Sequence, residues 1–526
     1  MSESTRTYQS RISEAYSDPL SAYASLMAVV EHKLFADLCK GKDSSSLKSA
    51  YLTQHGITAR QFNASRVKVE GKRDSIKQRQ KQLIEEKKHQ IEAIQTKLIK
   101  LKNKAAVHQK KRKFARLQSQ LRHLQEDRKA DRISLCFGGR KLFRAQFQLE
   151  DNHYTSHQDW KTTWRKSRSS EIFILGSKDE TAGNQNCTAT LAPDDSISLR
   201  VRMPDQLIPQ FGKYQIIPNI RFAYGHEAIK AAIQDCNLRR ELHLLGDPAY
   251  KNHGHAITFR FKNDHKGWRV FVSTNIALPK PITHHGNGMI AVDINSDHLA
   301  VAEMDRFGNL VHSRTIPLTL NSKTNHQARA LIGDAAAEII AFCEQRNKSL
   351  VIENLDFQKK RAQLKEKGTR YARMLSSFAY SSILTHLKSR GASKGVQVHT
   401  INPAFTSLIG RVKFAKRHGI SIHMAAAFCI GRRFLGFSER MPQHQRDVPD
   451  GKGGHVTLDL PVRNRTRHVW HQWRQLNQKI PAALTAHFRT VKNRSSSSRK
   501  TTPEIETLPD FIGATPVRES PASLLC

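Results

Sequence analysis

Cysteine is scarce in this sequence, and its few copies stand far apart. The 526 residues contain 7 cysteines, and no two of them form a Cys-x-x-Cys pair. Zinc ribbons need such pairs and disulfide frameworks need closely spaced cysteines, so both classes of protein are excluded. Dispersed thiols are typical of a reducing compartment. We therefore expect a cytoplasmic protein without structural zinc.

Long apolar stretches are also missing. No run approaches the roughly 20 apolar residues that cross a bilayer, and residues 1–20 lack the apolar core of a secretion signal. The sequence therefore predicts neither a membrane partner nor export from the cell.

Acidic residues are few in comparison with basic ones. The chain has 86 Lys and Arg against 46 Asp and Glu, a formal net charge of +40 at pH 7. An excess of this size favours a polyanionic partner, either a nucleic acid or an anionic membrane. Because the membrane lacks support, the composition predicts a large nucleic-acid-binding protein that associates with the nucleoid.

Apolar residues recur at heptad-like spacing between residues 67 and 132. Ile84, Ile91 and Leu98 belong to this pattern, which predicts two long antiparallel helices with a break near residues 103–107. Their polar faces carry a large excess of Lys and Arg. Such faces are often only solvated, but charge of one sign repels itself unless a polyanion screens it. We therefore expect this region to contact nucleic acid.

Two further regions are predicted to contain strands. Alternating apolar and polar residues with turns between them, as at 197–202 and 257–272, indicate antiparallel hairpins within 133–286. From 287 to 440 strands alternate with helices, which is typical of an α/β domain with a mixed sheet. Its expected strands are 289–295, 298–304, 310–317, 349–354 and 395–401, and its expected helices are 324–346 and 370–391.

Two acidic residues interrupt apolar strands of this α/β region. Asp293 lies in the run MIAVDIN and Glu353 in the run SLVIEN. A buried carboxylate costs several kcal/mol unless it is paired, coordinated or shifted in pKa. Either acid alone fits an ion pair with a neighbouring Lys or Arg. Together they fit a shared divalent cation, because Mg²⁺ prefers carboxylate oxygens and water. Such cations activate water in phosphodiester cleavage.

Three segments in this order carry a specific resemblance. They are IAVDIN (290–295), VIENLDFQKKR (351–361) and a segment that ends in INPAFTS (401–407). Over about 288–436 the chain resembles the split RuvC nuclease domain of TnpB proteins, transposon-encoded relatives of type V CRISPR effectors. The long basic helices and the β-rich segment before it are similar to the recognition and wedge domains of that family.

The resemblance implies an RNA-guided DNA endonuclease with an RNase H-like fold. Such a protein would bind a guide RNA derived from the transposon end and cut a matched DNA target with Mg²⁺ or Mn²⁺. Asp293 and Glu353 match the first and second catalytic acids of the family.

The expected fold class is multidomain α+β, with an RNase H-like (RuvC) α/β nuclease domain, an antiparallel β-barrel-like wedge domain and a basic helical recognition domain. The expected parts are the N-terminal part of the wedge with the start of the helical domain (1–60), the helical recognition domain (61–132), the β-rich wedge (133–286), the RuvC-like domain (287–440), a C-terminal basic and aromatic extension (441–489), and a disordered tail (490–526).

The sequence departs from the family pattern where a zinc-binding cysteine cluster usually follows the NPxxTS motif. After Ser407 the chain runs LIGRVKFAKRHGISIH, with no cysteine. We therefore expect no zinc there. The basic residues of this segment are candidates for phosphate contacts: Arg411, Lys413, Lys416 and Arg417.

A second departure affects the third catalytic acid. The family places an Asp near the start of its last helix, and this chain has His423 there, in HMAAAFCI. Helical spacing puts His423 on the apolar face that covers the sheet, so we expect it to point toward Asp293 and Glu353. A neutral imidazole ligates a metal or acts as a general base near pH 7. The alternatives are a core histidine in an inactive site, or a third acid from Asp447 or Asp450.

Two other functions fit parts of this pattern. A nuclease-dead RNA-guided DNA binder, such as a repressor, would explain the missing third acid. A DNA transposase with an RNase H-like core is the other, although the large basic helical region suits structured RNA better. Trp470 and Trp473 have the spacing of core residues on one helix face, and base stacking is their alternative role.

Overall fold

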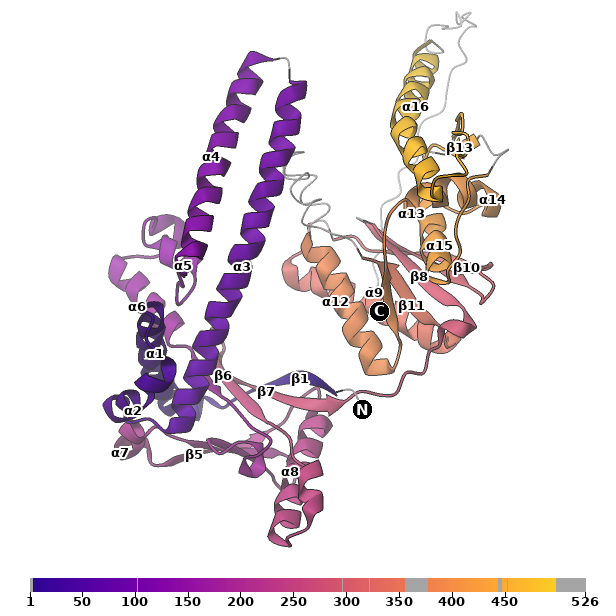
Figure 1. Ribbon diagram of the computed structural model, residues 1–526. Coiled ribbons are helices and arrows are strands. Elements are labelled where there is room, and N and C mark those ends of the chain that lie inside the picture. The colour runs from indigo at the N-terminus through magenta and orange to yellow at the C-terminus, as the bar shows by residue number, and fades with distance from the viewer. Residues whose placement is uncertain are drawn as a thin grey trace, which may run out of the picture. The chain divides into compact units, whose positions relative to one another are not determined.

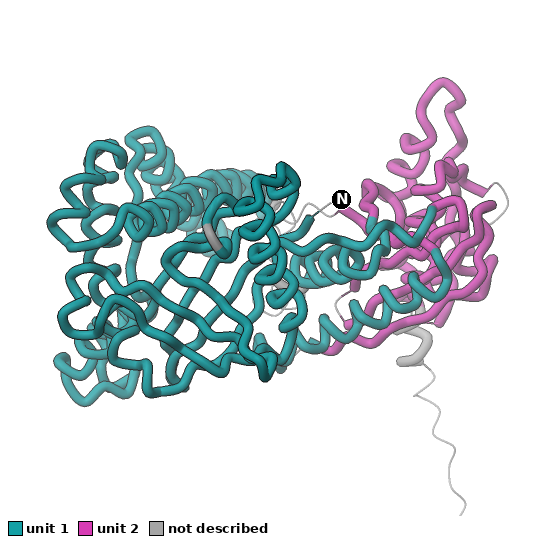
Figure 2. The backbone as a smooth tube through the Cα atoms, turned by 90° about the horizontal axis from the view of Figure 1, so that it is seen from below, with its two compact units in different colours: residues 1–284, 320–347, 355–398 teal, residues 285–319, 348–354, 399–526 magenta. Residues whose placement is uncertain are grey.

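The computed structural model describes residues 3–101, 103–295, 297–320, 322–354, 377–442, 447–451 and 453–497. The chain divides into two compact units, coloured separately in Figure 2. The first unit comprises residues 1–284, 320–347 and 355–398, and the second comprises residues 285–319, 348–354 and 399–526. The domain limits expected from the sequence stay a prediction.

Two antiparallel sheets form the β part of the first unit. One has the strand order β1-β7-β6-β2 and the other the order β3-β4-β5. Apolar residues of both sheets, such as Leu199 and Phe261, lie in one shared core. The strands are β1 (Glu3–Arg11), β2 (Glu171–Ile174), β3 (Cys187–Leu191), β4 (Ile197–Arg202), β5 (Tyr214–Ile220), β6 (Thr258–Asp264) and β7 (Gly267–Ala277).

The structure confirms the antiparallel hairpins predicted around 197–202 and 257–272. The first is formed by β3 and β4, and the second by β6 and β7. The N-terminal strand β1 pairs with β7 along its whole length, with Glu3 opposite Ala277 and Arg11 opposite Arg269. The described strands of this unit form a four-stranded and a three-stranded sheet. A barrel-like closure of the wedge therefore stays a prediction.

The long helical hairpin of the first unit is confirmed as α3 and α4, which run side by side in Figure 1. The break between them lies after Lys100 and before Lys104, earlier than the predicted 103–107. Thr58 and Gln61 form a capping box at the start of α3, and the side chain of Asn103 caps α4. The helices of this unit are α1 (Ser17–Cys39), α2 (Ser44–His55), α3 (Ala59–Lys100), α4 (Lys104–Lys129), α5 (Arg140–Ala145), α6 (His157–Arg168), α7 (Ile208–Phe211), α8 (His226–Leu244), α9 (Asn325–Arg346) and α12 (Ser377–Lys394).

A five-stranded mixed sheet has the strand order β10-β9-β8-β11-β12. β8 pairs antiparallel with β9 and parallel with β11. The strands are β8 (Met289–Ile294), β9 (His298–Met304), β10 (Leu310–Pro317), β11 (Ser349–Glu353) and β12 (Val398–Ile401). The predicted strands and the helix at 324–346 are confirmed, although β12 is shorter than expected. Of the helix predicted at 370–391, residues 370–376 lie outside the described residues, and the rest is α12.

Helices of the second unit cover one face of this sheet. Ala427 and Ile430 of α15 share a core with Ala291 of β8 and Val351 of β11. The remaining elements are α13 (Thr406–Ile409), a π-helix (Gly410–Ala415), α14 (Lys416–His418), α15 (Ile422–Phe434), β13 (Asp447–Pro449), β14 (His455–Thr457) and α16 (Val469–Ser497).

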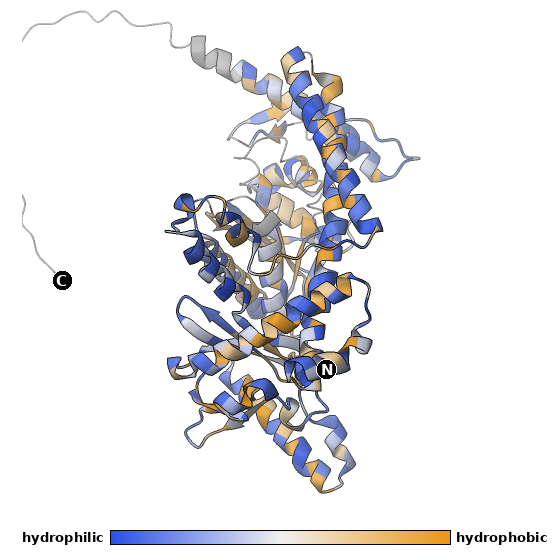
Figure 3. Cartoon of the chain, turned by 90° about the vertical axis from the view of Figure 1, so that its left-hand side faces the viewer, coloured by the Kyte–Doolittle hydropathy of each residue, from blue (hydrophilic) through white to orange (hydrophobic). Residues whose placement is uncertain are grey.

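Hydrophilic and hydrophobic residues are intermixed along the helices, as Figure 3 shows. Among the described residues, no helix is both long and apolar enough to span a membrane.

Candidate active site

The register of two parallel strands brings the two predicted acids together. Ile352 of β11 lies opposite Val292 of β8, so the next residues along, Glu353 and Asp293, are neighbours across the strands. Paired strands lie about 4.8 Å apart, and opposite residues project from the same face. That face carries Ala291 and packs against α15. The two carboxylates therefore lie on the covered face, at the carboxyl ends of their strands.

Helix α15 brings the third predicted residue to the same place. The side chain of Ser421 accepts a hydrogen bond from the amide of Met424 and so starts the helix. His423 lies in the first turn, with its Nδ1 3.4 Å from Oδ2 of Asp293. The Asp293 side chain is 8% exposed and that of His423 is 49% exposed. The pair therefore joins a buried carboxylate to an imidazole that solvent or substrate can reach.

Two neighbours of this pair were not anticipated from the sequence. Asn295 donates a hydrogen bond of 3.0 Å from its Nδ2 to Oδ2 of Asp293. The ring of His298 lies edge-on to the ring of His423, with centroids 4.8 Å apart. Asn295 ends the motif IAVDIN, so its position two residues after the acid was the available signal. These contacts fix the orientation of Asp293 and restrict His423.

Glu353 has a buried hydroxyl partner from the NPAFTS segment. Thr406 donates a hydrogen bond from its Oγ1 to Oε1 of Glu353, and its side chain is buried. Phe405 precedes it with a φ of +64°, a left-handed conformation that is strained for a bulky residue. This turn starts α13 and aims Thr406 at the carboxylate. The motif had signalled the family resemblance, but not this contact.

The thiol of Cys429 lies on α15, the helix that carries His423, and is fully buried. Burial raises the pKa of this thiol to about 12, while nearby charges act in both directions: Arg433 and Arg432 lower it, and Glu439 and Glu353 raise it. The thiol therefore stays protonated at pH 7.

The donors at this site are chemically suited to a hard divalent cation. Asp293 and Glu353 supply carboxylate oxygens from adjacent strands, and Mg²⁺ is commonly held by one or two carboxylates together with water and substrate phosphate. Within the described residues, no group of three or more His, Cys, Asp or Glu side chains is arranged to hold a metal ion. The two carboxylates on adjacent strands therefore fit a cation whose remaining positions water and substrate would fill.

The alternative third acids have other partners. Asp447 accepts hydrogen bonds from Thr457 and Lys416, and these lower the pKa of its carboxyl. Asp450 accepts a hydrogen bond from the amide of Gly454 and contacts His487 of α16. His423, by contrast, contacts Asp293 directly, so the geometry favours His423 as the third member of the site.

The four residues predicted to contact phosphate differ in their ion pairs and in their exposure to solvent. Lys413 pairs with the buried carboxylate of Glu439, and Lys416 pairs with Asp447 at 3.3 Å. Burial lowers the pKa of Arg411. Arg417 is exposed. Lys413 therefore serves first as an internal partner, and Arg417 is the most accessible of the four; their role at phosphates stays a prediction.

The two tryptophans of α16 have different environments. Trp473 is fully buried and donates a hydrogen bond from its Nε1 to the carbonyl oxygen of Glu439. The core assignment is therefore confirmed for Trp473. Trp470 is half-buried, with the guanidinium of Arg433 5.4 Å from its ring.

Comparison with known proteins gives only a distant likeness. No family model matches the chain, and no curated protein matches it. A solved structure of T. thermophilus RuvC in complex with a Holliday junction substrate is 13% identical, with a TM-score of 0.21, and the match covers 27% of this chain and 88% of RuvC. A second Thermus thermophilus RuvC structure is 12% identical, with a TM-score of 0.22, and the match covers 28% of this chain and 96% of that RuvC chain. A likeness this weak carries no functional argument, so function rests on the geometry of the site.

Proposed function

We propose that this protein is a divalent-metal-dependent DNA endonuclease guided by RNA, of the TnpB type. The observation that supports it best is the cluster at one end of the sheet. Asp293 and Glu353 leave adjacent parallel strands on the same face, and His423 contacts Asp293 from the helix that covers that face. Two buried acids with an accessible imidazole suit hydrolysis of a phosphodiester.

In this proposal Asp293 and Glu353 hold the cation, Mg²⁺ or Mn²⁺. The bound cation would activate water and stabilise negative charge on phosphate oxygens. Asn295 and Thr406 orient the two carboxylates by donating hydrogen bonds to them. His423 faces Asp293 through Nδ1, which leaves Nε2 as the atom that exchanges a proton with water or the leaving oxygen.

The guide RNA enters the proposal through charge and the family resemblance. The chain carries a net charge of +40, and the basic hairpin of α3 and α4 offers a long cationic surface. Base pairing between guide and target would carry the sequence information, so the protein needs many backbone contacts and few base contacts. The guide would derive from the transposon end, and the target would be DNA.

A co-purification experiment tests this function. The protein is expressed with its own genomic flanks, the bound RNA is sequenced, and a matched DNA is incubated with the complex in Mg²⁺ and in Mn²⁺. We expect one defined RNA and cleavage of the matched DNA only. A protein that binds no specific RNA would contradict the guided mechanism.

A second candidate function is guided DNA binding without cleavage. The observation that favours it is that His423, which contacts Asp293, brings no carboxylate to the site, so the site offers a cation fewer hard ligands. The same experiment separates the two candidates. A defined RNA with tight binding of matched DNA, but no cleavage in either metal, would establish the binder.

A further inference from the structure

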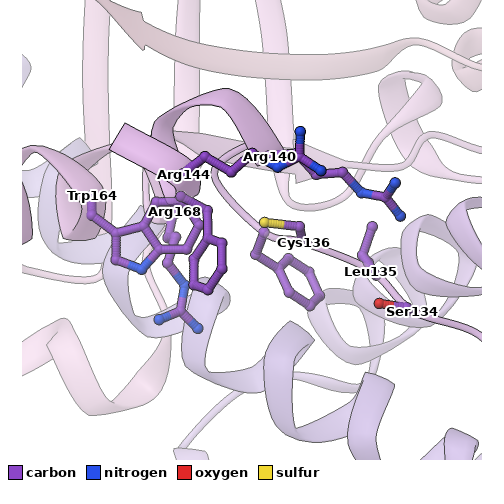
Figure 4. A pocket seen from close by; sticks show the side chains of 9 residues that line it. Ser134, Leu135, Cys136, Arg140, Arg144, Trp164 and Arg168 are labelled. Carbon is purple, nitrogen blue, oxygen red and sulfur yellow. The ribbon is translucent and has the colours of Figure 1, made fainter. Parts of the chain in front are cut away.

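An open pocket of about 540 Å³ lies in the first unit, away from the proposed cleavage residues in sequence. It is formed by the loop after α4 and by helices α5 and α6, and Figure 4 shows its side chains. Its lining combines aromatic rings with guanidinium groups: Phe137, Arg140, Phe143, Arg144, Trp164 and Arg168. The volume falls within the range of pockets that take a small molecule.

The pocket is built by close packing rather than by a loose loop. A Cβ on Gly138 would lie 2.9 Å from Cγ of Arg168 and 3.0 Å from Cζ3 of Trp164, and its φ is +85°, so only glycine fits there. Trp160 stacks on Trp164 with ring centroids 5.9 Å apart. Trp160 also donates a hydrogen bond of 2.8 Å from its Nε1 to the carbonyl oxygen of Leu142. The walls are therefore held in place before any ligand binds.

Two residues that line the pocket, Phe137 and Arg168, contact helix α1. The ring of Phe137 packs on His32, with centroids 4.0 Å apart, and Arg168 donates a hydrogen bond to Nδ1 of His32. Burial and the nearby positive charges lower the pKa of His32 to about 4, so it stays neutral at pH 7. A neutral imidazole leaves the positive charge of Arg168 uncompensated at the pocket.

Two arginines of the pocket form no ion pair with the acidic residues that the structure describes. Arg140 and Arg144 lie one turn apart on α5 and project along one side of the pocket, as Figure 4 shows. No carboxylate lines the pocket, and within the described residues neither arginine forms an ion pair. Guanidinium groups bind phosphate oxygens in a bidentate manner. A phosphate group would therefore supply the negative charge that pairs with these two arginines.

The aromatic side chains offer a stacking surface beside these arginines. Phe143 is 42% exposed, so part of its ring faces solvent. Its ring lies 5.5 Å from the ring of Trp164. A flat base stacks on such rings in a sequence-tolerant way.

We propose that this pocket binds one nucleotide of a single-stranded nucleic acid, with its base against Phe143 and Trp164 and its phosphate against Arg140 and Arg144. A duplex keeps its bases stacked inside and offers only phosphates, so it would leave the aromatic surface unused. The site goes beyond the proposed cleavage function, because it needs neither a metal nor the acids of the sheet.

Photo-crosslinking tests this site directly. The full-length protein is titrated with a ten-nucleotide single strand that carries 5-iodouracil, and crosslinked peptides are mapped by mass spectrometry. We expect crosslinks within residues 134–168. Phe143→Ala should raise the concentration for half-maximal crosslinking in this segment about tenfold, as should Arg140→Ala combined with Arg144→Ala.

Matched controls come from the same unit. Tyr224→Ala removes an 85% exposed ring, and Arg165→Ala removes an exposed arginine of α6; neither lines the pocket, so both should crosslink like the unmodified protein. A competing duplex or free mononucleotide should displace the single strand only at far higher concentration. If the free mononucleotide competed as well as the single strand, the ligand of the pocket would be a free nucleotide. That result would overturn the proposal.

Absence of crosslinks within residues 134–168, or equal effects of Phe143→Ala and Tyr224→Ala on those crosslinks, would also overturn it. The crosslinking experiment tests the pocket independently of the cleavage proposal, because Asp293→Asn should leave these crosslinks unchanged.

Discussion

The side chain of His423 is the third member of the proposed site, and its Nδ1 lies 3.4 Å from Oδ2 of Asp293. An imidazole brings no negative charge and is a softer ligand than a carboxylate, so it weakens Mg²⁺ and relatively favours Mn²⁺. It also brings a proton acceptor that works near pH 7. At the residue scale, the chemistry of the proposed site therefore depends on His423.

His423→Ala should abolish DNA cleavage and leave guide RNA binding intact, because the proposed guide-binding residues are those of α3 and α4. His423→Asp should keep or raise cleavage in Mg²⁺, since it restores a hard ligand. Cleavage rates in Mg²⁺ and Mn²⁺ and RNA affinity are the measurements. His455→Ala, on the exposed side of β14, is the control. Full activity of His423→Ala would remove the residue from the site.

A second buried acid in the sheet shows why sequence alone could not rank these residues. Glu303 also interrupts an apolar strand, but it lies opposite Ile290, on the other face from Asp293. There it forms an ion pair of 2.7 Å with Lys348, and both residues are buried. The acids at 293 and 353 were predicted from their apolar surroundings and from the motif. The same apolar signal at 303 has a structural cause that only the register reveals.

Lys348→Met should lower the free energy of unfolding by about 3 kcal/mol, because it removes a buried partner of Glu303. Lys416→Met, which breaks the exposed pair with Asp447, should cost less than about 1 kcal/mol. Urea denaturation of both variants checks the difference. Equal losses would mean that burial does not govern these pairs.

At the scale of elements, the position of α15 depends on a close helix crossing. Gly410, at the start of the π-helix, approaches the backbone of α15 so closely that a Cβ would lie 2.6 Å from the carbonyl carbon of Ala425 and the amide nitrogen of Ala426. Backbone atoms cannot rotate aside as a side chain does. The glycine therefore sets the position of the helix that carries His423.

Gly410→Ala should destabilise the protein by about 2 kcal/mol and lower cleavage, because α15 must move and take His423 away from Asp293. Gly71→Ala is the matched control, since Gly71 lies inside α3 with no atom near its missing Cβ. That change should stabilise the protein by about 0.5–1 kcal/mol. Thermal melting and cleavage rates check both. A stable, fully active Gly410→Ala protein would show that the crossing tolerates a methyl group.

The elements differ in how far sequence patterns predict them. Heptad spacing located α3 and α4, because a helix repeats its apolar contacts every few residues. Period-two alternation located the strands of both units. The pairing of β1 with β7 joins residues more than 250 positions apart, so no local pattern specifies it. The π-helix at Gly410–Ala415 was also missed, because it depends on packing against α15.

At the scale of the whole molecule, the positive charge is the dominant property. The formal net charge of +40 would make the folded chain repel itself in the absence of a polyanion. Arg140 and Arg144 at the pocket of α5 and α6, which form no ion pair within the described part of the chain, fit the same picture. Nucleic acid is therefore expected to act as a stabilising partner as well as a substrate.

RNA affinity should fall steeply as KCl rises from about 50 to about 200 mM, since each phosphate contact releases counterions. Six to ten such contacts correspond to a loss of about 10³–10⁵-fold. Filter binding or fluorescence anisotropy across this salt range checks the slope. Unchanged affinity would contradict a binding mode based on backbone charge.

Cleavage of guide-matched DNA by Asp293→Asn tests the central claim most directly. This change keeps the size of the side chain and removes the charge that a cation needs, so cleavage should fall by about 10³-fold or more while RNA and DNA binding persist. Asp447→Asn, an exposed acid that pairs with Lys416, is the control and should cut normally. Equal cleavage by the unmodified protein and Asp293→Asn would show that the catalytic site lies elsewhere.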